Sequence, residues 1–223
     1  MRRATTVVAV VAALLLAIGF AADRAVAAVA ERTITDRIEQ SVPGASSVET
    51  SIHGVPVLTQ ALRGSLDHVT VTLRGVPSGS GPAIDSAVVD LYDVTTSSPR
   101  TAGRVEARAE VTTAELQKAL GDTWRIRPDG DAFAVEWTGG LPVRARVVPV
   151  VRDGKLALDL ESVTVLGVRV GGSSVPAAVT EQMSALAASV GALPLGLEPT
   201  AVTVTPRGVE LVATGTDVNL EAA

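Results

Sequence analysis

Residues 124–137 read WRIRPDGDAFAVEW, and this stretch indicates how the chain folds. A short run of alternating apolar and basic residues leads to Asp129 and Gly130, and an apolar run follows them. An Asp-Gly pair between two such runs is a strong signal for a β-hairpin with a tight turn. We therefore expect two antiparallel strands here, at residues 124–126 and 132–137.

The same turn chemistry recurs further along the chain. Residues 143–151 and 156–160 flank Asp153-Gly154, and residues 202–204 and 209–213 flank Arg207-Gly208. Because strands follow one another instead of alternating with helices, a parallel doubly wound sheet is disfavoured. The predicted fold class is antiparallel α+β, with residues 23–223 forming a single domain.

Helical patterns occupy three other segments. In residues 23–42, Val26, Ala30, Ile34, Ile38 and Val42 recur every four residues between charged ones, which predicts an amphipathic helix. Residues 112–121 carry the capping pattern of Thr and Glu three residues apart and end in glycine. Residues 174–191 form a third predicted helix, with one apolar face and a final glycine.

The N-terminal residues 1–22 have the pattern of an export segment. Arg2 and Arg3 precede an uncharged run over residues 4–22, which is at the lower limit of what spans a bilayer. A cleaved signal peptide and a retained membrane anchor both remain open. Cleavage motifs occur at Gly19-Phe20-Ala21 and at 25–27. Either alternative predicts an extracytoplasmic, cell-envelope location.

The composition limits the functions that the chain can have. Hydrophobic residues make up 47% and aromatic residues only 2%, so the apolar mass is aliphatic. A formal net charge of −5 with scattered arginines disfavours a nucleic-acid partner. The chain has no cysteine and therefore neither a thiolate nucleophile nor a thiolate metal site. No cofactor is expected.

One cluster contains residue types that could perform catalysis. Ser65, Asp67 and His68 would suit acyl transfer, and His53 and His68 could share a metal ion with Asp67. However, neighbouring residues of a strand point to opposite faces, and neither a nucleophile elbow nor a metal-binding spacing is present. We therefore predict a protein that is not an enzyme. A lipid hydrolase that uses this cluster is the alternative.

The start AADRAVAAVAERTITDRI, the segment HGVPVLTQALRGSLDHVTVTLRGV and the end LPLGLEPTAVTVTPRGVELVATGTDVNL resemble the LmeA-like phospholipid-binding proteins of actinobacterial cell envelopes. The order of these motifs is similar across almost the whole chain. The family often has Phe where Val55 and Val57 stand, and residues 80–160 match by pattern more than by motif. The resemblance supplies no catalytic residues.

The resemblance implies a fold of the tubular lipid-binding type, in which a strongly curved antiparallel sheet wraps a long helix. It also implies phospholipid binding and a role in envelope lipid or lipoglycan maintenance, as a carrier or transfer module. A non-catalytic scaffold for another protein is a further alternative. The expected lipid-binding residues are apolar and could equally be ordinary core: Val55, Val57, Leu58, Leu62, Val179, Met183 and Leu186.

Overall fold

The computed structural model describes residues 2–77, 81–140, 142–170 and 193–221. These residues form an α+β structure with three α-helices and two antiparallel sheets, one of six strands and one of five. The helices are α1 (Arg2–Ser41), α2 (Val57–Arg63) and α3 (Thr113–Leu120). The predicted helix at 174–191 lies outside the described residues.

The six-stranded sheet has the order β1-β2-β3-β4-β11-β10. Its strands are β1 (Ser47–His53), β2 (Ser65–Val76), β3 (Ile84–Thr95), β4 (Thr101–Thr112), β10 (Glu198–Thr205) and β11 (Gly208–Asn219). The five-stranded sheet runs in chain order from β5 to β9. Its strands are β5 (Trp124–Asp129), β6 (Ala132–Trp137), β7 (Val143–Arg152), β8 (Lys155–Val165) and β9 (Val168–Val170).

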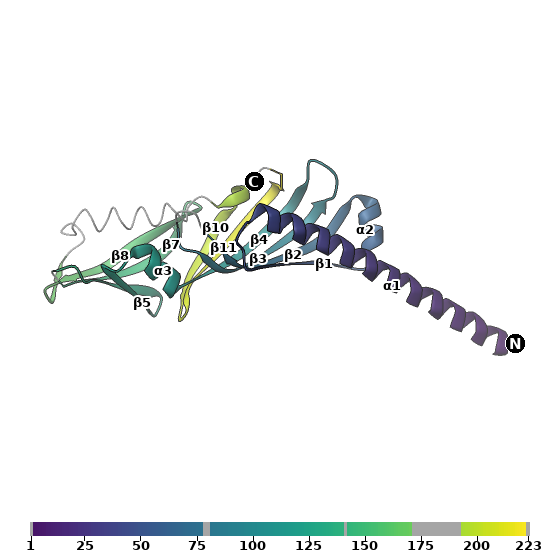
Figure 1. Ribbon diagram of the computed structural model, residues 1–223, viewed down its shortest axis with the longest axis horizontal. Helices are drawn as coiled ribbons and strands as arrows, with labels where there is room; N and C mark the ends of the chain where they lie inside the picture. The colour runs from purple at the N-terminus through teal and green to yellow at the C-terminus, as the bar shows by residue number, and fades with distance from the viewer. Residues whose placement is uncertain (1, 78–80, 141, 171–192, 222–223) are drawn as a thin grey trace.

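The two sheets lie one after the other along the long axis of the molecule (Figure 1). Helix α1 runs across the six-stranded sheet, and its N-terminal part extends beyond the sheet near α2 (Figure 1). Neither sheet is strongly curled, so the expected strongly curved sheet around a long helix is not present in the described residues. The chain passes from the six-stranded to the five-stranded sheet at α3 and returns to the six-stranded sheet with β10. Neither sheet closes around α1.

The largest core lies between α1 and the six-stranded sheet. Ala27, Ala30, Ile34 and Ile38 of α1 pack with the inward-facing residues of this sheet. The core face is rotated from the predicted one, because Ala27 is 3% exposed whereas Val26 is 38% exposed. The small Ala27 side chain is therefore the one that faces the sheet.

The three predicted hairpins are confirmed. In the first, Trp124 pairs with Trp137 and Asp129 with Ala132 across the turn. The other two join β7 to β8 and β10 to β11. Helix α3 is confirmed as well, because the Thr112 hydroxyl accepts a hydrogen bond from the Glu115 N–H and Gly121 follows the last turn. Local signals therefore place these elements correctly.

No helix within the described residues has the combined length and hydropathy of a membrane-spanning segment.

Candidate functional site

The stretch that contains both histidines folds as strand, helix and strand. The helix, α2, begins after Pro56, which supplies no side-chain cap. A residue of α1 takes that role: the Leu58 N–H donates to Oδ1 of Asp23 at 2.8 Å. Asp23 is only 4% exposed and also pairs with Arg24 at 3.0 Å. The Leu58 N–H, together with Arg24, holds the pKa of Asp23 below its ordinary value of 3.8.

Gln60 holds the other side of α2. Its side chain is 2% exposed, accepts the Asp67 N–H at 2.8 Å and donates to the His53 carbonyl at 3.3 Å. One amide group thus joins α2 to the end of β1 and the start of β2. Gln117 of α3 does the same for β5, because it accepts the Ile126 N–H and donates to the Trp124 carbonyl.

Replacing Gln60 by leucine should destabilise the protein by about 1–3 kcal/mol, because the Asp67 N–H and the His53 carbonyl lose a buried partner. Chemical denaturation of both proteins measures this difference. Gln60→Glu is the matched comparison: its protonated carboxyl accepts the Asp67 N–H and donates to the His53 carbonyl, so in mild acid it should cost less than Gln60→Leu. Equal stability of wild type and Gln60→Leu would contradict the role assigned to this amide.

The structure separates the predicted lipid-binding residues of this stretch. Val57 is fully buried in the core beneath α1, whereas Val55, Leu58 and Leu62 are 61%, 44% and 81% exposed. Val179, Met183 and Leu186 lie outside the described residues. Contact of any of these seven residues with lipid stays a prediction.

The polar residues of the stretch are not arranged as a catalytic triad. Asp67 lies 3.8 Å from Arg63, whereas His68 Nε2 contacts Asp90 Oδ1 at 2.9 Å. In the described part of the chain, no hydrogen bond joins Ser65, Asp67 and His68. No group of three or more potential metal ligands occurs there either.

The outer face of the six-stranded sheet carries a row of stacked side chains instead. The rings of His53 and His68 are 4.3 Å apart, those of His68 and Tyr92 are 4.5 Å apart, and the Arg104 guanidinium lies 4.1 Å from the Tyr92 ring. This row runs from β1 to β4 because the four residues are cross-strand partners.

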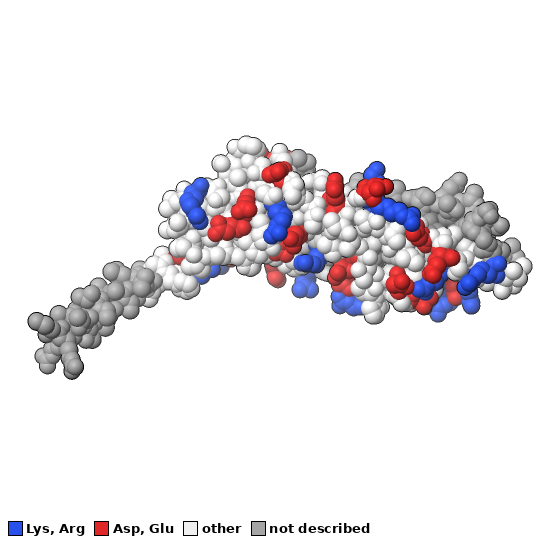
Figure 2. Space-filling view, turned by 180° about the vertical axis from the view of Figure 1, so that it is seen from behind, with Lys and Arg blue, Asp and Glu red and all other residues white. Residues whose placement is uncertain are grey.

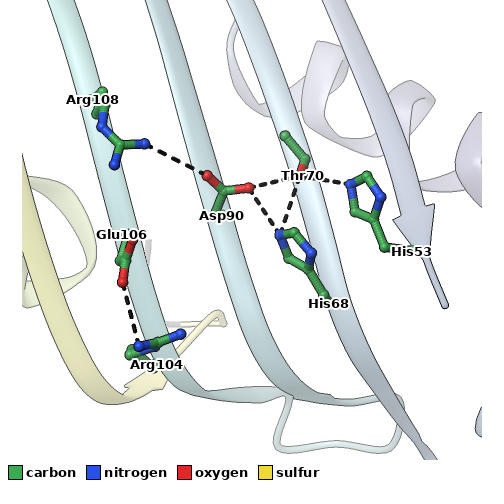
Figure 3. A network of polar contacts seen from close by, with 7 residues as sticks. All are labelled: His53, His68, Thr70, Asp90, Arg104, Glu106 and Arg108. Atoms are coloured by element: carbon green, nitrogen blue, oxygen red, sulfur yellow. Dashed lines mark hydrogen bonds and ion pairs between the residues drawn. The ribbon is translucent and has the colours of Figure 1, made fainter.

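Hydrogen bonds fix the row at its centre (Figure 3). The Thr70 hydroxyl donates to Asp90 Oδ1 at 2.7 Å and therefore accepts from His53 Nε2 at 2.8 Å. Burial raises the pKa of Asp90, but the bonds from Thr70 and His68 outweigh it and leave the pKa below its ordinary value. The acidic and basic groups of this network thus contact one another (Figure 3). Acidic and basic side chains are also interspersed over the face of the molecule seen in Figure 2.

An apolar cavity lies at the junction of the two sheets. Its volume is about 160 Å³. One wall comes from β3, β4, β10 and β11, the other comes from β5 to β8, and α3 contributes Leu116 and Leu120. The other lining residues are also apolar: Pro82, Ile84, Ala109, Val111, Trp124, Ile126, Phe133, Val135, Ala145, Val147, Pro149, Leu156, Leu158, Leu193, Val202, Val209 and Leu211.

The cavity exists because inward-facing residues of both sheets meet across a gap. Phe133 and Ile126 of the first hairpin are buried with Leu116 and Val204, and Val147 is buried among residues of the second hairpin. Alternation in the sequence predicts that these side chains face inward. It carries no information on how far apart the two sheets stand, so it does not separate a filled core from a cavity.

The side chains that line this cavity suit an apolar ligand. Among the described residues, the lining offers neither a charged group nor a nucleophile. An apolar cavity of about 150 Å³ is large enough to bind benzene. The shape and lining of the site suit a hydrocarbon group, which is the feature expected of a lipid-binding class of protein.

Comparison with protein families agrees with this class. The model of the LmeA-like phospholipid-binding family matches residues 21–214, and the chain belongs to this family. No curated protein and no solved structure matches the chain significantly. Family membership favours a binding protein over a catalytic one.

Proposed function

We propose that this protein is a cell-envelope phospholipid carrier that holds an acyl chain in the cavity between its two sheets and leaves the lipid chemically unchanged. The observation that carries the proposal is the apolar lining that the described residues of both sheets and α3 form. Phospholipid binding by the family supports the same choice of ligand.

The energetics favour an acyl chain as the ligand. Each methylene group removed from water contributes about 0.8 kcal/mol, so six of them contribute about 5 kcal/mol. A cavity of about 160 Å³ has room for a segment of this order rather than for a whole phospholipid. The head group and the rest of the molecule would therefore remain outside the described cavity.

The proposed location is outside the cytoplasm. Arg2, Arg3 and the uncharged run over residues 4–22 support export, with this run either removed or kept as an anchor in the membrane. Residues 23–223 would then form the lipid-binding domain. A role in envelope lipid or lipoglycan maintenance follows if the bound lipid is passed on.

Quenching of tryptophan fluorescence tests the proposal directly. Trp124 lines the cavity, and the chain has only one other tryptophan, Trp137, which is absent from the lining. In a Trp137→Phe protein, phospholipid with bromine in mid-acyl positions should quench Trp124, because bromine would sit beside the indole. Phospholipid brominated only at the head group should quench it less. Native mass spectrometry should show the same lipid bound with its acyl chains intact.

Two results would contradict the proposal. Trp124 emission that does not respond to acyl-brominated phospholipid would remove the cavity as the binding site. Release of free fatty acid that depends on His68 would instead support the hydrolase alternative, which the separation of Ser65, Asp67 and His68 disfavours.

A further inference from the structure

Four large apolar side chains are exposed at the corner where α1 meets α2. Phe20, Val55, Leu58 and Leu62 are 56%, 61%, 44% and 81% exposed. They form what we call the tip patch. Contacts of α1 hold its members together: the Arg24 guanidinium lies 5.9 Å from the Phe20 ring and donates to the Gly54 carbonyl, next to Val55, and Asp23 binds the Leu58 N–H.

The exposure of these side chains is a consequence of how α2 is anchored. A short helix on a protein surface usually buries its leucines and exposes its polar residues. In α2 the polar Gln60 is 2% exposed, whereas Leu62 is 81% exposed. The bonds of Gln60 to β1 and β2, together with that of Asp23 to Leu58, fix this orientation. Large apolar side chains that gather exposed at one corner of a protein mark interaction surfaces.

The neighbouring chain indicates what covers the patch. Phe20 lies at the end of the uncharged run over residues 4–22, and α1 continues as one helix from that run to the tip. The N-terminal part of α1 leaves the body of the molecule next to α2 (Figure 1). In the full-length chain the tip patch directly follows the uncharged run along α1, so a bilayer that takes up this run also lies beside the patch.

Basic groups at the edge of the patch fit the same partner. Arg24 and Arg63 flank the patch, and their side chains are 38% and 60% exposed. Among the described residues, the ion-pair partner of Arg63 is Asp67, at the long distance of 3.8 Å. Arginines beside apolar side chains match an interface in which phosphates lie above acyl chains.

We propose that the tip patch docks on the surface of a phospholipid bilayer, with Leu58, Leu62 and Val55 in contact with lipid. This surface lies apart from the cavity, and docking there does not depend on the proposed carrier function. The patch gives the exposed residues of the 53–71 stretch a role: contact with the membrane rather than with a single bound lipid.

A site-specific label tests the docking. The chain has no cysteine, so Leu62→Cys offers a single attachment point for an environment-sensitive bimane. The full-length protein is reconstituted into vesicles of phosphatidylcholine and phosphatidylglycerol, with and without acyl-brominated lipid. We expect the brominated lipid to lower the emission by about twofold or more, because a docked side chain reaches the boundary between head groups and acyl chains.

Val29→Cys is the matched control. Val29 is also apolar and 64% exposed, and it lies nine residues beyond Phe20 on the solvent side of α1. Its label should be unaffected by bromine. Equal emission of the Leu62 label with and without brominated lipid would overturn the proposal.

A second variant separates docking from simple tethering by α1. With the label at Val55→Cys, the double substitution Leu58→Glu and Leu62→Glu should abolish quenching, because charges at these positions oppose insertion. Neither side chain belongs to the buried core, so the double variant should still unfold in one cooperative thermal transition, and Trp124 should still be quenched by lipid in the cavity. Quenching at Val55 that survives both substitutions would show that α1 alone brings the tip near the bilayer and would overturn the proposal.

Discussion

Replacing Ala109 by phenylalanine should reduce the binding of acyl-brominated phospholipid at Trp124 by about tenfold or more, because each lost methylene contact removes about 0.8 kcal/mol. Ala109 lines the cavity from β4, and its methyl group faces the space between the sheets. A phenyl ring is about the size of the benzene that fills a 150 Å³ cavity. The ring would therefore occupy most of the volume of about 160 Å³ that the cavity offers to an acyl chain.

Val88→Phe is the control for this experiment. Val88 lies on β3 and faces the outer side of the same sheet, next to Arg108 of β4. It gains a ring of the same kind without entering the cavity, so lipid binding should be retained. Both variants should fold, because the ring at position 109 enters free volume and the ring at position 88 lies on the half-buried outer face of the sheet. Undiminished quenching of Trp124 in Ala109→Phe, with its fold intact, would place the lipid elsewhere.

The elements that the sequence predicts well are those whose signals are local. The Asp129-Gly130 turn and the Thr112 cap each require a particular residue type at one position, and both formed as expected. For α1, the sequence predicts a core face that begins at residue 26, whereas the observed one begins at residue 27. The two faces share residues 30, 34 and 38, so the periodicity alone separates them poorly. Only contact with the sheet selects Ala27.

Helix α2 and the cavity were missed for a different reason. A seven-residue helix is too short to be stable alone or to show a helical period. Its first turn depends on Asp23, 35 positions before Leu58 in the sequence. The cavity likewise depends on the division of the strands into two sheets and on the distance between them. Such long-range relations leave no pattern in a window of neighbouring residues.

Removal of residues 1–27 should destabilise the protein far more than removal of residues 1–21. The sequence offers a cleavage motif at each position, but the two products differ in structure. The longer one, 22–223, keeps Asp23, Arg24 and the buried Ala27, whereas 28–223 loses all three. Because the shorter product loses the cap of α2 and part of the core, we expect its Tm to be roughly 5–10 °C lower. Thermal unfolding of the two fragments measures this difference.

The loss should be traceable to α2. In 28–223, hydrogen exchange at the Leu58 amide should be faster, because the acceptor of this N–H is gone. Asp23→Ala in the 22–223 fragment should reproduce that local effect while leaving the helix length unchanged. Equal Tm values and equal protection of Leu58 in both fragments would contradict the argument and leave both cleavage positions compatible with the fold.

The pH dependence of stability separates the contribution of the Asp23 charge from that of packing by the rest of α1. The folded-state pKa of Asp23 lies below 3.8, so its carboxylate stabilises the folded state fully above that pH. This contribution decreases as the pH falls from 3.8 through the lower folded-state pKa. Protonation then removes the carboxylate charge, which the Leu58 N–H and Arg24 stabilise in the folded state. The stability difference between the 22–223 fragment and its Asp23→Ala variant should therefore be constant near neutral pH and shrink in acid. A difference that persists undiminished in acid would assign the stabilisation to packing of the side chain rather than to its charge.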